Sequence, residues 1–206
     1  MCNIKVIAFD CDGVLFNSEK ANTAYYDRIL NHLGLPEMTP EQFAFVHMHT
    51  VSDALSYLFA EEKMLQQAYA FSKNTGYFDF IKLMEIEPYL KTLLENVRPS
   101  IKTAVATNRT NTMGQVLKEH GLEGQFDLVV CALDVAQPKP YPDMLVKVLD
   151  HFEIAAHEML FVGDSLLDAQ AAIAATVPFV AYGNASLPAD HHITTLKALE
   201  DIIGFY

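Results

Sequence analysis

The stretch VIAFDCDGV at residues 6–14 decides the fold of this chain. Its first four residues form a short, continuous apolar run, which is typical of a strand buried on both faces of a parallel sheet. Asp10 and Asp12 follow at once, and Gly13 allows the backbone to turn sharply away. Ligands of open α/β sheets bind outside the carboxyl ends of the strands, so we expect a polar site directly after this run.

Four further apolar runs have the same character, and amphipathic segments alternate with them. The runs are Thr103–Ala106, Leu128–Cys131, Met159–Val162 and Phe179–Tyr182. The segments with apolar residues at helical spacing are Glu87–Asn96, Thr110–His120, Pro142–Phe152 and Ser165–Ala175. This alternation predicts an α/β fold with a Rossmann-like, doubly wound parallel sheet.

The alternation is interrupted between the first and second apolar runs. Residues 17–86 contain no strand-like run, and the segment is expected to be helical throughout. Thr39-Pro40-Glu41-Gln42 is typical of a capping box with proline at the first helical position. The segment is too long for a simple connection. We therefore predict a helical cap domain at 17–86, inserted into an α/β core made of 1–16 and 87–206.

Composition narrows the class of protein. The chain has 206 residues, 51% of them hydrophobic, and a net charge of -12 with scattered Lys and Arg, which disfavours nucleic-acid binding. No apolar run approaches the roughly 20 residues of a membrane span, and no signal-peptide pattern is present. Cys2, Cys11 and Cys131 lack the spacing of a disulfide framework or a zinc site. We expect a cytoplasmic protein without a membrane or nucleic-acid partner; its oligomeric state stays open.

Asp10 and Asp12 are the first candidates for chemistry. Residues i and i+2 of an extended chain point the same way, so the two carboxylates would share one site. Like charges that close need a proton or a cation, which suits a nucleophile, a proton donor and a metal. The alternative interpretation is a strand-ending turn, where Asp and Gly are common.

Two more candidate groups come later in the chain. Thr107 and Asn108 follow the second apolar run, and they would either bind a phosphate oxygen or cap the next helix. Lys139 stands between Pro138 and Pro140. It would supply compact positive charge to a phosphoryl group, or it is a surface lysine in a proline turn.

The last candidate group is GDSLLD at residues 163–168, after the fourth apolar run. Asp164 is placed like a ligand of a hard cation. Ser165 and Asp168 also fit a capping box for the next helix. Each of these signals is weak alone, but together they would meet at one face of the sheet.

The cap would choose the substrate by closing over the site. Its polar or amphipathic residues include Tyr25, His47, His49 and Thr50. The spacing of His47 and His49 hints at a metal pair, but positions i and i+2 do not share a helix face. A substrate contact by either histidine and a solvated or core histidine are the two remaining interpretations.

Together, these residues resemble the four motifs of the haloacid dehalogenase superfamily, over the range Ile7 to Tyr182. The layout resembles its phosphoglycolate phosphatase-like and β-phosphoglucomutase-like members. The resemblance implies that Asp10 attacks phosphorus and forms an aspartyl-phosphate. Asp12 would protonate the leaving oxygen and then activate water, and Lys139 would supply positive charge.

The resemblance also implies the remaining site residues. Thr107 and Asn108 would hold the phosphoryl oxygens, and Gly13 belongs to the same expected binding site. Mg²⁺ would lie between Asp10, the backbone carbonyl of Asp12 and Asp164, and Asp168 would orient the site from close by.

Three positions depart from the pattern of the superfamily. Asn17 stands where many members have aspartate, Thr176 stands where glycine is usual, and Pro138 is unusual before the lysine. None of these removes a chemical group from the implied mechanism, but they weaken an assignment to one subfamily.

We therefore predict a magnesium-dependent phosphatase that hydrolyses a small phosphorylated metabolite. A sugar-phosphate mutase of the same superfamily is the main alternative, since it would keep all four motifs and differ in its cap. A non-catalytic phosphate-binding regulator would have lost the nucleophile or the acid. A nucleotide-binding dehydrogenase would carry Gly-x-Gly-x-x-Gly after the first strand, and this chain does not.

Overall fold

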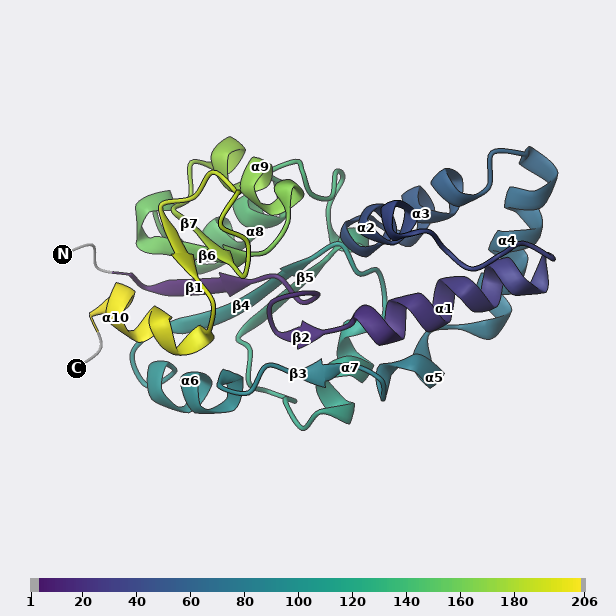
Figure 1. The fold of residues 1–206 in the computed structure, drawn as a ribbon. Helices are drawn as coiled ribbons and strands as arrows, with labels where there is room; N and C mark the ends of the chain where they lie inside the picture. Colours follow the sequence, from purple (N-terminus) through teal and green to yellow (C-terminus); the bar gives the residue numbers. More distant parts are fainter. Residues whose placement is uncertain (1–3, 205–206) are drawn as a thin grey trace.

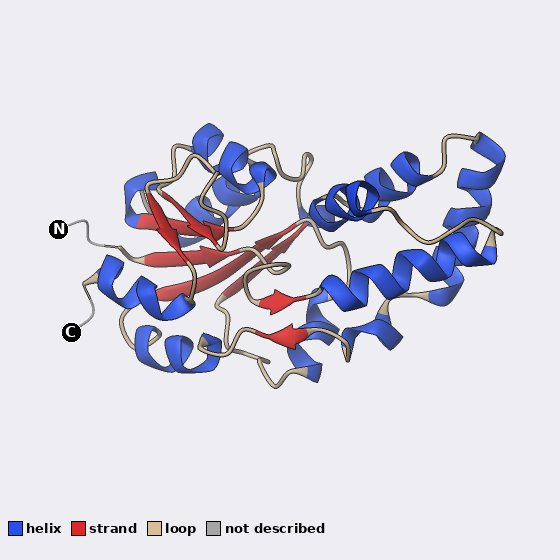
Figure 2. Cartoon of the chain, viewed as in Figure 1, coloured by secondary structure: helices blue, strands red, loops and turns tan. Residues whose placement is uncertain are grey.

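The structure, a computed structural model, describes residues 4–204 and contains a six-stranded sheet in the order β5-β4-β1-β6-β7-β8 (Figures 1 and 2). The strands are β1 Val6–Phe9, β4 Lys102–Thr107, β5 Leu128–Cys131, β6 Met159–Gly163, β7 Phe179–Tyr182 and β8 His191–Ile193. All neighbouring strands pair in parallel. The chain moves outward from β1 through β4 to β5 and then returns to β6 on the other side of β1. The predicted doubly wound α/β class is confirmed.

Helices cover both faces of the sheet, and β1 contributes to both cores. They are α6 Leu90–Val97, α7 Met113–Glu119, α8 Asp143–Phe152, α9 Leu166–Ala175 and α10 Leu199–Ile203, with short 3₁₀ turns at Ala132–Asp134, Ala156–Glu158 and Leu196–Ala198. Ile7 and Phe9 pack with residues of α6, α7 and α10, whereas Val6 and Ala8 pack with residues of α8 and α9. This alternation is the period-two pattern of a strand, and it explains the continuous apolar run. Within residues 4–204, no helix is both long and apolar enough for a membrane span.

Five helices between the first and second sheet strands form the cap, which extends beyond the carboxyl end of β1 (Figure 1). They are α1 Glu19–His32, α2 Pro40–Met48, α3 Val51–Leu58, α4 Glu62–Thr75 and α5 Phe78–Ile81. The predicted capping box is present, since Thr39 Oγ1 accepts from the Gln42 N–H at 3.2 Å and Gln42 Oε1 accepts from the Thr39 N–H at 2.9 Å. The boundaries of the cap at 17 and 86 stay a prediction.

The expectation that 17–86 is helical throughout was wrong at both ends. β2 Phe16–Asn17 and β3 Glu85–Ile86 pair antiparallel and form a two-stranded connection between cap and core. Two-residue strands are too short to show a period-two pattern. β8 also lies outside the five predicted strands, because two of its three residues are histidines.

Two predicted helices begin later than expected. α6 begins at Leu90 rather than Glu87, because Pro88 disfavours helical backbone at the residue before it. α7 begins at Met113 rather than Thr110, since short polar side chains bond locally and compete with helix formation.

Helix α9 ends in a strained conformation. Thr176, its C-cap, has φ 56° and ψ 32°, which is the left-handed region. β-Branched residues rarely adopt this region, whereas glycine does so freely. The departure noted at this position therefore carries a conformational cost.

We predict that Thr176→Gly raises the free energy of unfolding by about 1 kcal/mol, because it relieves this strain at an exposed position. Urea denaturation measures the change. Thr176→Ala, which removes the branching but keeps Cβ, should raise the free energy of unfolding by less. A loss of stability in the glycine variant would contradict the prediction.

Candidate active site

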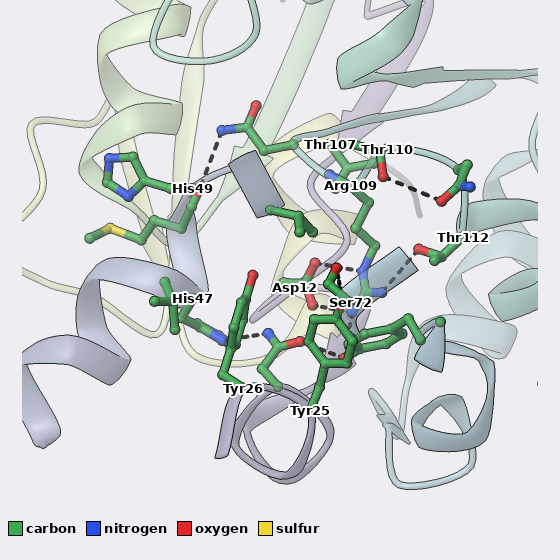
Figure 3. A pocket seen from close by; sticks show the side chains of 18 of the residues that line it. Asp12, Tyr25, Tyr26, His47, His49, Ser72, Thr107, Arg109, Thr110 and Thr112 are labelled. Carbon is green, nitrogen blue, oxygen red and sulfur yellow. Dashed lines mark hydrogen bonds and ion pairs between the residues drawn. The ribbon is translucent and has the colours of Figure 1, made fainter. Parts of the chain in front are cut away.

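A cavity of about 290 Å³ lies between the carboxyl end of the sheet and the cap (Figure 3). The core contributes Asp10 and Asp12 after β1, and 107–112 at and after the end of β4. The cap contributes residues of α1, α2 and α4 and of the connection from α4 to α5. The segments that the sequence singled out on β1 and β4 therefore do meet at one face of the sheet.

Lys139 lies buried between two aspartates. Its side chain is 2% exposed, and Nζ lies 2.8 Å from Asp10 Oδ1 and 2.6 Å from Asp168 Oδ1. Burial by itself lowers the pKa of Lys139, but the two carboxylates outweigh it and raise the pKa above its ordinary value. The interpretation of Lys139 as a surface lysine was wrong.

Asp168 belongs both to a helix cap and to an ion pair with Lys139. Its Oδ2 accepts hydrogen bonds from the Ser165 N–H at 3.1 Å and the Ser165 hydroxyl at 2.5 Å, and its own N–H donates to Ser165 Oγ. This is the predicted capping box at the start of α9. Because Asp168 Oδ1 contacts Lys139, the helix cap also holds the lysine in place.

Asp10 has one occupied and one free carboxylate oxygen. Oδ1 accepts from Lys139 and from the Cys11 N–H at 2.7 Å. No hydrogen-bond partner within 4–204 reaches Oδ2. Burial raises the pKa of Asp10 to about 7; Lys139 opposes this, whereas Asp168 and Asp12 add to it.

Asp12 pairs with a second cation, Arg109, which sequence reasoning missed. Arg109 Nε lies 2.7 Å from Asp12 Oδ2 and Nη2 lies 2.6 Å from Oδ1, and the Ser18 hydroxyl makes a short hydrogen bond to Oδ1. Burial alone would raise the pKa of Asp12, but Arg109 outweighs it and lowers the pKa below its ordinary value. The sequence did contain a signal for Arg109. Two close carboxylates need two counter-charges, and Arg109 directly follows Asn108, a predicted site residue.

A directed chain of hydrogen bonds runs from Arg109 into the cap. The guanidinium only donates, so Nη2 donates to the Tyr77 hydroxyl at 3.2 Å. Tyr77 then donates to Asn22 Oδ1 at 2.5 Å, and Asn22 Nδ2 donates to His47 Nδ1 at 3.0 Å. Burial lowers the pKa of His47, which favours the neutral ring, and a neutral ring that accepts at Nδ1 carries its proton on Nε2.

The structure does not bring His47 and His49 together as a pair. His49 Nδ1 lies 2.8 Å from the Phe45 carbonyl oxygen, and its ring stacks on the Phe45 ring at 3.8 Å. Both histidines line the cavity, but each is held by different partners. Substrate contact by either one stays a prediction.

Thr107 and Asn108 form hydrogen bonds that hold neighbouring residues of the site in position. Thr107 Oγ1 accepts from the Arg109 N–H at 3.2 Å. The Asn108 side chain accepts from the Lys139 N–H at 3.0 Å and donates to the carbonyl oxygens of Lys139 and Met48, both at 3.1 Å. The helix-capping interpretation of these two residues was wrong. The Asn108 side chain instead holds the loop that carries Lys139 and forms a hydrogen bond with the cap.

The aspartates next to Lys139 form a potential metal site. Carboxylate oxygens of Asp10, Asp164 and Asp168 lie within 4.8 Å of one another. Asp168 is occupied by Lys139 and Ser165, whereas the Asp164 carboxylate has no partner within 4–204. Burial, followed by the charges of Asp168 and Asp10, raises the pKa of Asp164 to about 8.

This donor set fits a hard cation such as Mg²⁺, because oxygen ligands and uncompensated negative charge are available together. Gly13 leaves room for the carboxylate of Asp164. A Cβ at Gly13 would lie 1.9 Å from Asp164 Oδ2, and φ there is 78°. A side chain at position 13 would therefore displace Asp164.

The thiol groups of Cys11 and Cys131 take no part in this site, to which Cys11 contributes its backbone N–H. Burial, together with the nearby Asp12, raises the pKa of the Cys11 thiol well above its ordinary value. Cys11 therefore behaves as a small apolar side chain, as expected, and Cys131 is also free and buried. Cys2 lies outside the described residues.

The raised pKa values of Asp10 and Asp164 predict how stability changes with pH. Between about pH 4 and pH 8 the folded protein retains protons that the unfolded chain has released, so the stability of metal-free protein falls as pH rises. Mg²⁺ should counteract this, and it should raise Tm by roughly 3–10 °C more near pH 8.5 than near pH 5.5. Differential scanning fluorimetry measures both effects.

Asp164→Asn should remove most of the Mg²⁺ effect, whereas Asp150→Asn, at an exposed position of α8, should retain it. An equal Mg²⁺ response at both pH values, or in both variants, would contradict the metal site.

Comparisons with known proteins agree with this geometry. The model of the haloacid dehalogenase-like hydrolase family matches residues 7–182. A phosphoglycolate phosphatase from Aliivibrio fischeri is 32% identical over 184 residues, which cover 84% of this chain and 81% of the relative. The chain therefore belongs to the haloacid dehalogenase-like hydrolase family, and the predicted membership and enzyme class are confirmed.

Solved structures extend the likeness to the whole fold. A haloacid dehalogenase superfamily hydrolase of subfamily IA from Geobacter sulfurreducens is 36% identical, with a TM-score of 0.81 and coverage of 98% of this chain and 97% of that chain. A β-phosphoglucomutase from Clostridium difficile, 18% identical, has a TM-score of 0.82 over 98% and 97% of the two chains. At that identity, the second likeness concerns the fold alone.

Proposed function

We propose that the protein is a magnesium-dependent phosphatase that hydrolyses small phosphomonoesters through an aspartyl-phosphate on Asp10. The observation that carries this proposal is the asymmetry of the Asp10 carboxylate. Lys139 and the Cys11 N–H hold Oδ1, which leaves Oδ2 free beside the cavity. A carboxylate fixed through one oxygen presents the other as a nucleophile in a defined direction.

The reaction has two halves. In the first, Asp10 Oδ2 bonds to phosphorus, the bond from phosphorus to the ester oxygen breaks, and Asp12 gives a proton to the leaving alcohol. In the second, Asp12 takes a proton from water, the water oxygen bonds to phosphorus, and the bond to Asp10 breaks to release phosphate. The ester is converted to an alcohol and inorganic phosphate.

Arg109 favours the second half, because it keeps Asp12 ionised and ready to accept a proton. The first half requires a protonated Asp12. A substrate that brings its own negative charge into the cavity competes for Arg109, and this weakens the hold of the guanidinium on Asp12.

The phosphoryl group would be held by the surrounding core residues. Gly13, Thr107 and Asn108 are its proposed contacts; since the Asn108 side chain is occupied, its backbone N–H is the group that remains. Asp10, Asp164 and the backbone carbonyl of Asp12 would hold Mg²⁺, which when bound supplies positive charge for the phosphoryl oxygens. Lys139 keeps Asp10 in place, and Asp168 keeps Lys139 in place.

The names of similar proteins suggest a first substrate. Several relatives between 27% and 32% identical are phosphoglycolate phosphatases. We therefore propose 2-phosphoglycolate, or a similarly small phosphomonoester, as the first compound to test. The mutase alternative predicts formation of an isomeric sugar phosphate in place of net phosphate release.

The test measures phosphate release from 2-phosphoglycolate and a panel of phosphorylated metabolites, including sugar phosphates, with Mg²⁺ and with a chelator. Wild-type protein should release phosphate only with Mg²⁺. Asp10→Asn should lower kcat by at least about 1000-fold without loss of the fold, because it removes the nucleophile. Asp150→Asn serves as the matched control and should leave kcat unchanged.

Turnover retained in Asp10→Asn would contradict the covalent mechanism. Isomer formation without net phosphate release would favour the mutase.

A further inference from the structure

The hydroxyl group of Tyr26 faces the cavity and has no hydrogen-bond partner among residues 4–204. Tyr26 belongs to α1, lines the cavity and is 4% exposed. Figure 3 shows its hydroxyl directed into the cavity, toward the part that holds Asp12 and Arg109, and no dashed line reaches it. No group within residues 4–204 forms a hydrogen bond with it. A hydroxyl that no protein group engages is available to donate a hydrogen bond to a ligand in the cavity.

The hydroxyl groups of the two other tyrosines that line the cavity are already occupied. The Tyr25 hydroxyl bonds to Ser72 Oγ at 2.8 Å, and the Tyr77 hydroxyl bonds to Asn22 and Arg109. Of the three tyrosines that line the cavity, only Tyr26 therefore presents a free hydroxyl. That hydroxyl has no role in the architecture of the described cap.

The Tyr26 ring is held in a fixed orientation. It packs edge-on against the Tyr25 ring, with the centroids 5.1 Å apart and an interplanar angle of 69°. Tyr26 also belongs to the main hydrophobic core cluster. A hydroxyl on a ring held in this way loses little conformational freedom when it binds a ligand.

The charges around Tyr26 indicate the kind of acceptor. Burial raises the pKa of Tyr26 well above its ordinary value, so the hydroxyl is neutral and donates. The cap residues that line the cavity include Lys73, His47 and His49 but, among residues 4–204, no Asp or Glu. In a chain with a net charge of -12, a cavity wall without carboxylates suits an anionic group on the ligand.

The position of Tyr26 indicates which part of the ligand it meets. Arg109 and Asp12 are close enough for their charges to affect it. Asp12 is the proposed proton donor to the leaving oxygen, so the alcohol part of a bound ester would lie on this side of the phosphoryl group.

We propose that Tyr26 determines specificity by donating a hydrogen bond to a carboxylate on the alcohol part of the substrate. The protein would therefore prefer small phosphomonoesters that carry such a group over esters that lack it. This inference rests on the proposed function and deepens it.

The test compares 2-phosphoglycolate with ethyl phosphate, which has a methyl group in place of the carboxylate. The measured quantity is the ratio of kcat/KM for the two compounds. Tyr26→Phe removes only the hydroxyl and should lower this ratio by about 10-fold to 100-fold, the usual effect of a lost hydrogen bond to a charged group. Tyr69→Phe, which removes a cap hydroxyl that bonds to Ser52 away from the cavity, should keep the wild-type ratio.

An unchanged ratio in Tyr26→Phe, or an equal fall in both variants, would overturn the assignment. Binding separates this inference from the proposed function. Calorimetry in the Asp10→Asn background, with Mg²⁺, gives Kd for both compounds without turnover. If wild-type protein hydrolyses neither ester, the proposed function fails. A lower Kd for 2-phosphoglycolate than for ethyl phosphate that Tyr26→Phe abolishes would still support the role of Tyr26. No such preference in the protein that retains Tyr26 would overturn it.

Discussion

The site is organised around one buried positive charge, the ammonium group of Lys139. A charge removed from water must be paired, and Lys139 is paired twice, with Asp10 and Asp168. These partners come from the end of β1 and the first turn of α9, and the lysine comes from the loop between β5 and α8. The ion pairs therefore tie three segments that are distant in the sequence to one point. Asn108 adds a fourth segment, since its side chain bonds to both backbone polar groups of Lys139.

This arrangement gives the two aspartates after β1 different properties. Asp10 shares its cation with Asp168, and burial raises its pKa to about 7. Among the described residues, Arg109 pairs with no other carboxylate than Asp12, and the pKa of Asp12 is lowered. Opposite shifts of two neighbouring carboxyl groups are a common way for a site to assign separate roles to similar side chains. Arg109 also donates to the Tyr77 hydroxyl, so the hydrogen bonds around Asp12 continue into the cap.

The sequence was sufficient for the core strands and for most of the site, because both depend on local patterns. Continuous apolar runs identify β1, β4, β5, β6 and β7, and a polar residue after such a run lies at the functional edge of the sheet. The sequence was insufficient where structure depends on contacts between distant segments. β2 and β3 are too short for a pattern, and β8 begins with two histidines.

The contacts of the site that the sequence did not determine have the same explanation. The sequence places Arg109 next to Asn108, but nothing local determines that its side chain pairs with Asp12. The same holds for Asn108, whose side chain bonds to Lys139 rather than capping a helix. Tyr26 is adjacent to Tyr25, and only the folded cap shows that the Tyr25 hydroxyl is occupied while that of Tyr26 is free. Asp168 was open to two interpretations because it fulfils both, as a helix cap and as a partner of Lys139.

If Asp10 is the nucleophile, phosphorus is attacked twice, first by Asp10 and then by water. The most direct measurement is the stereochemical course at phosphorus, with a phosphorothioate ester made chiral by two oxygen isotopes and hydrolysed in water of the third isotope, so that the thiophosphate product is chiral. Each in-line displacement inverts the configuration, so two displacements predict net retention in the product. Net inversion would mean a single direct displacement and would contradict the role of Asp10 as the nucleophile.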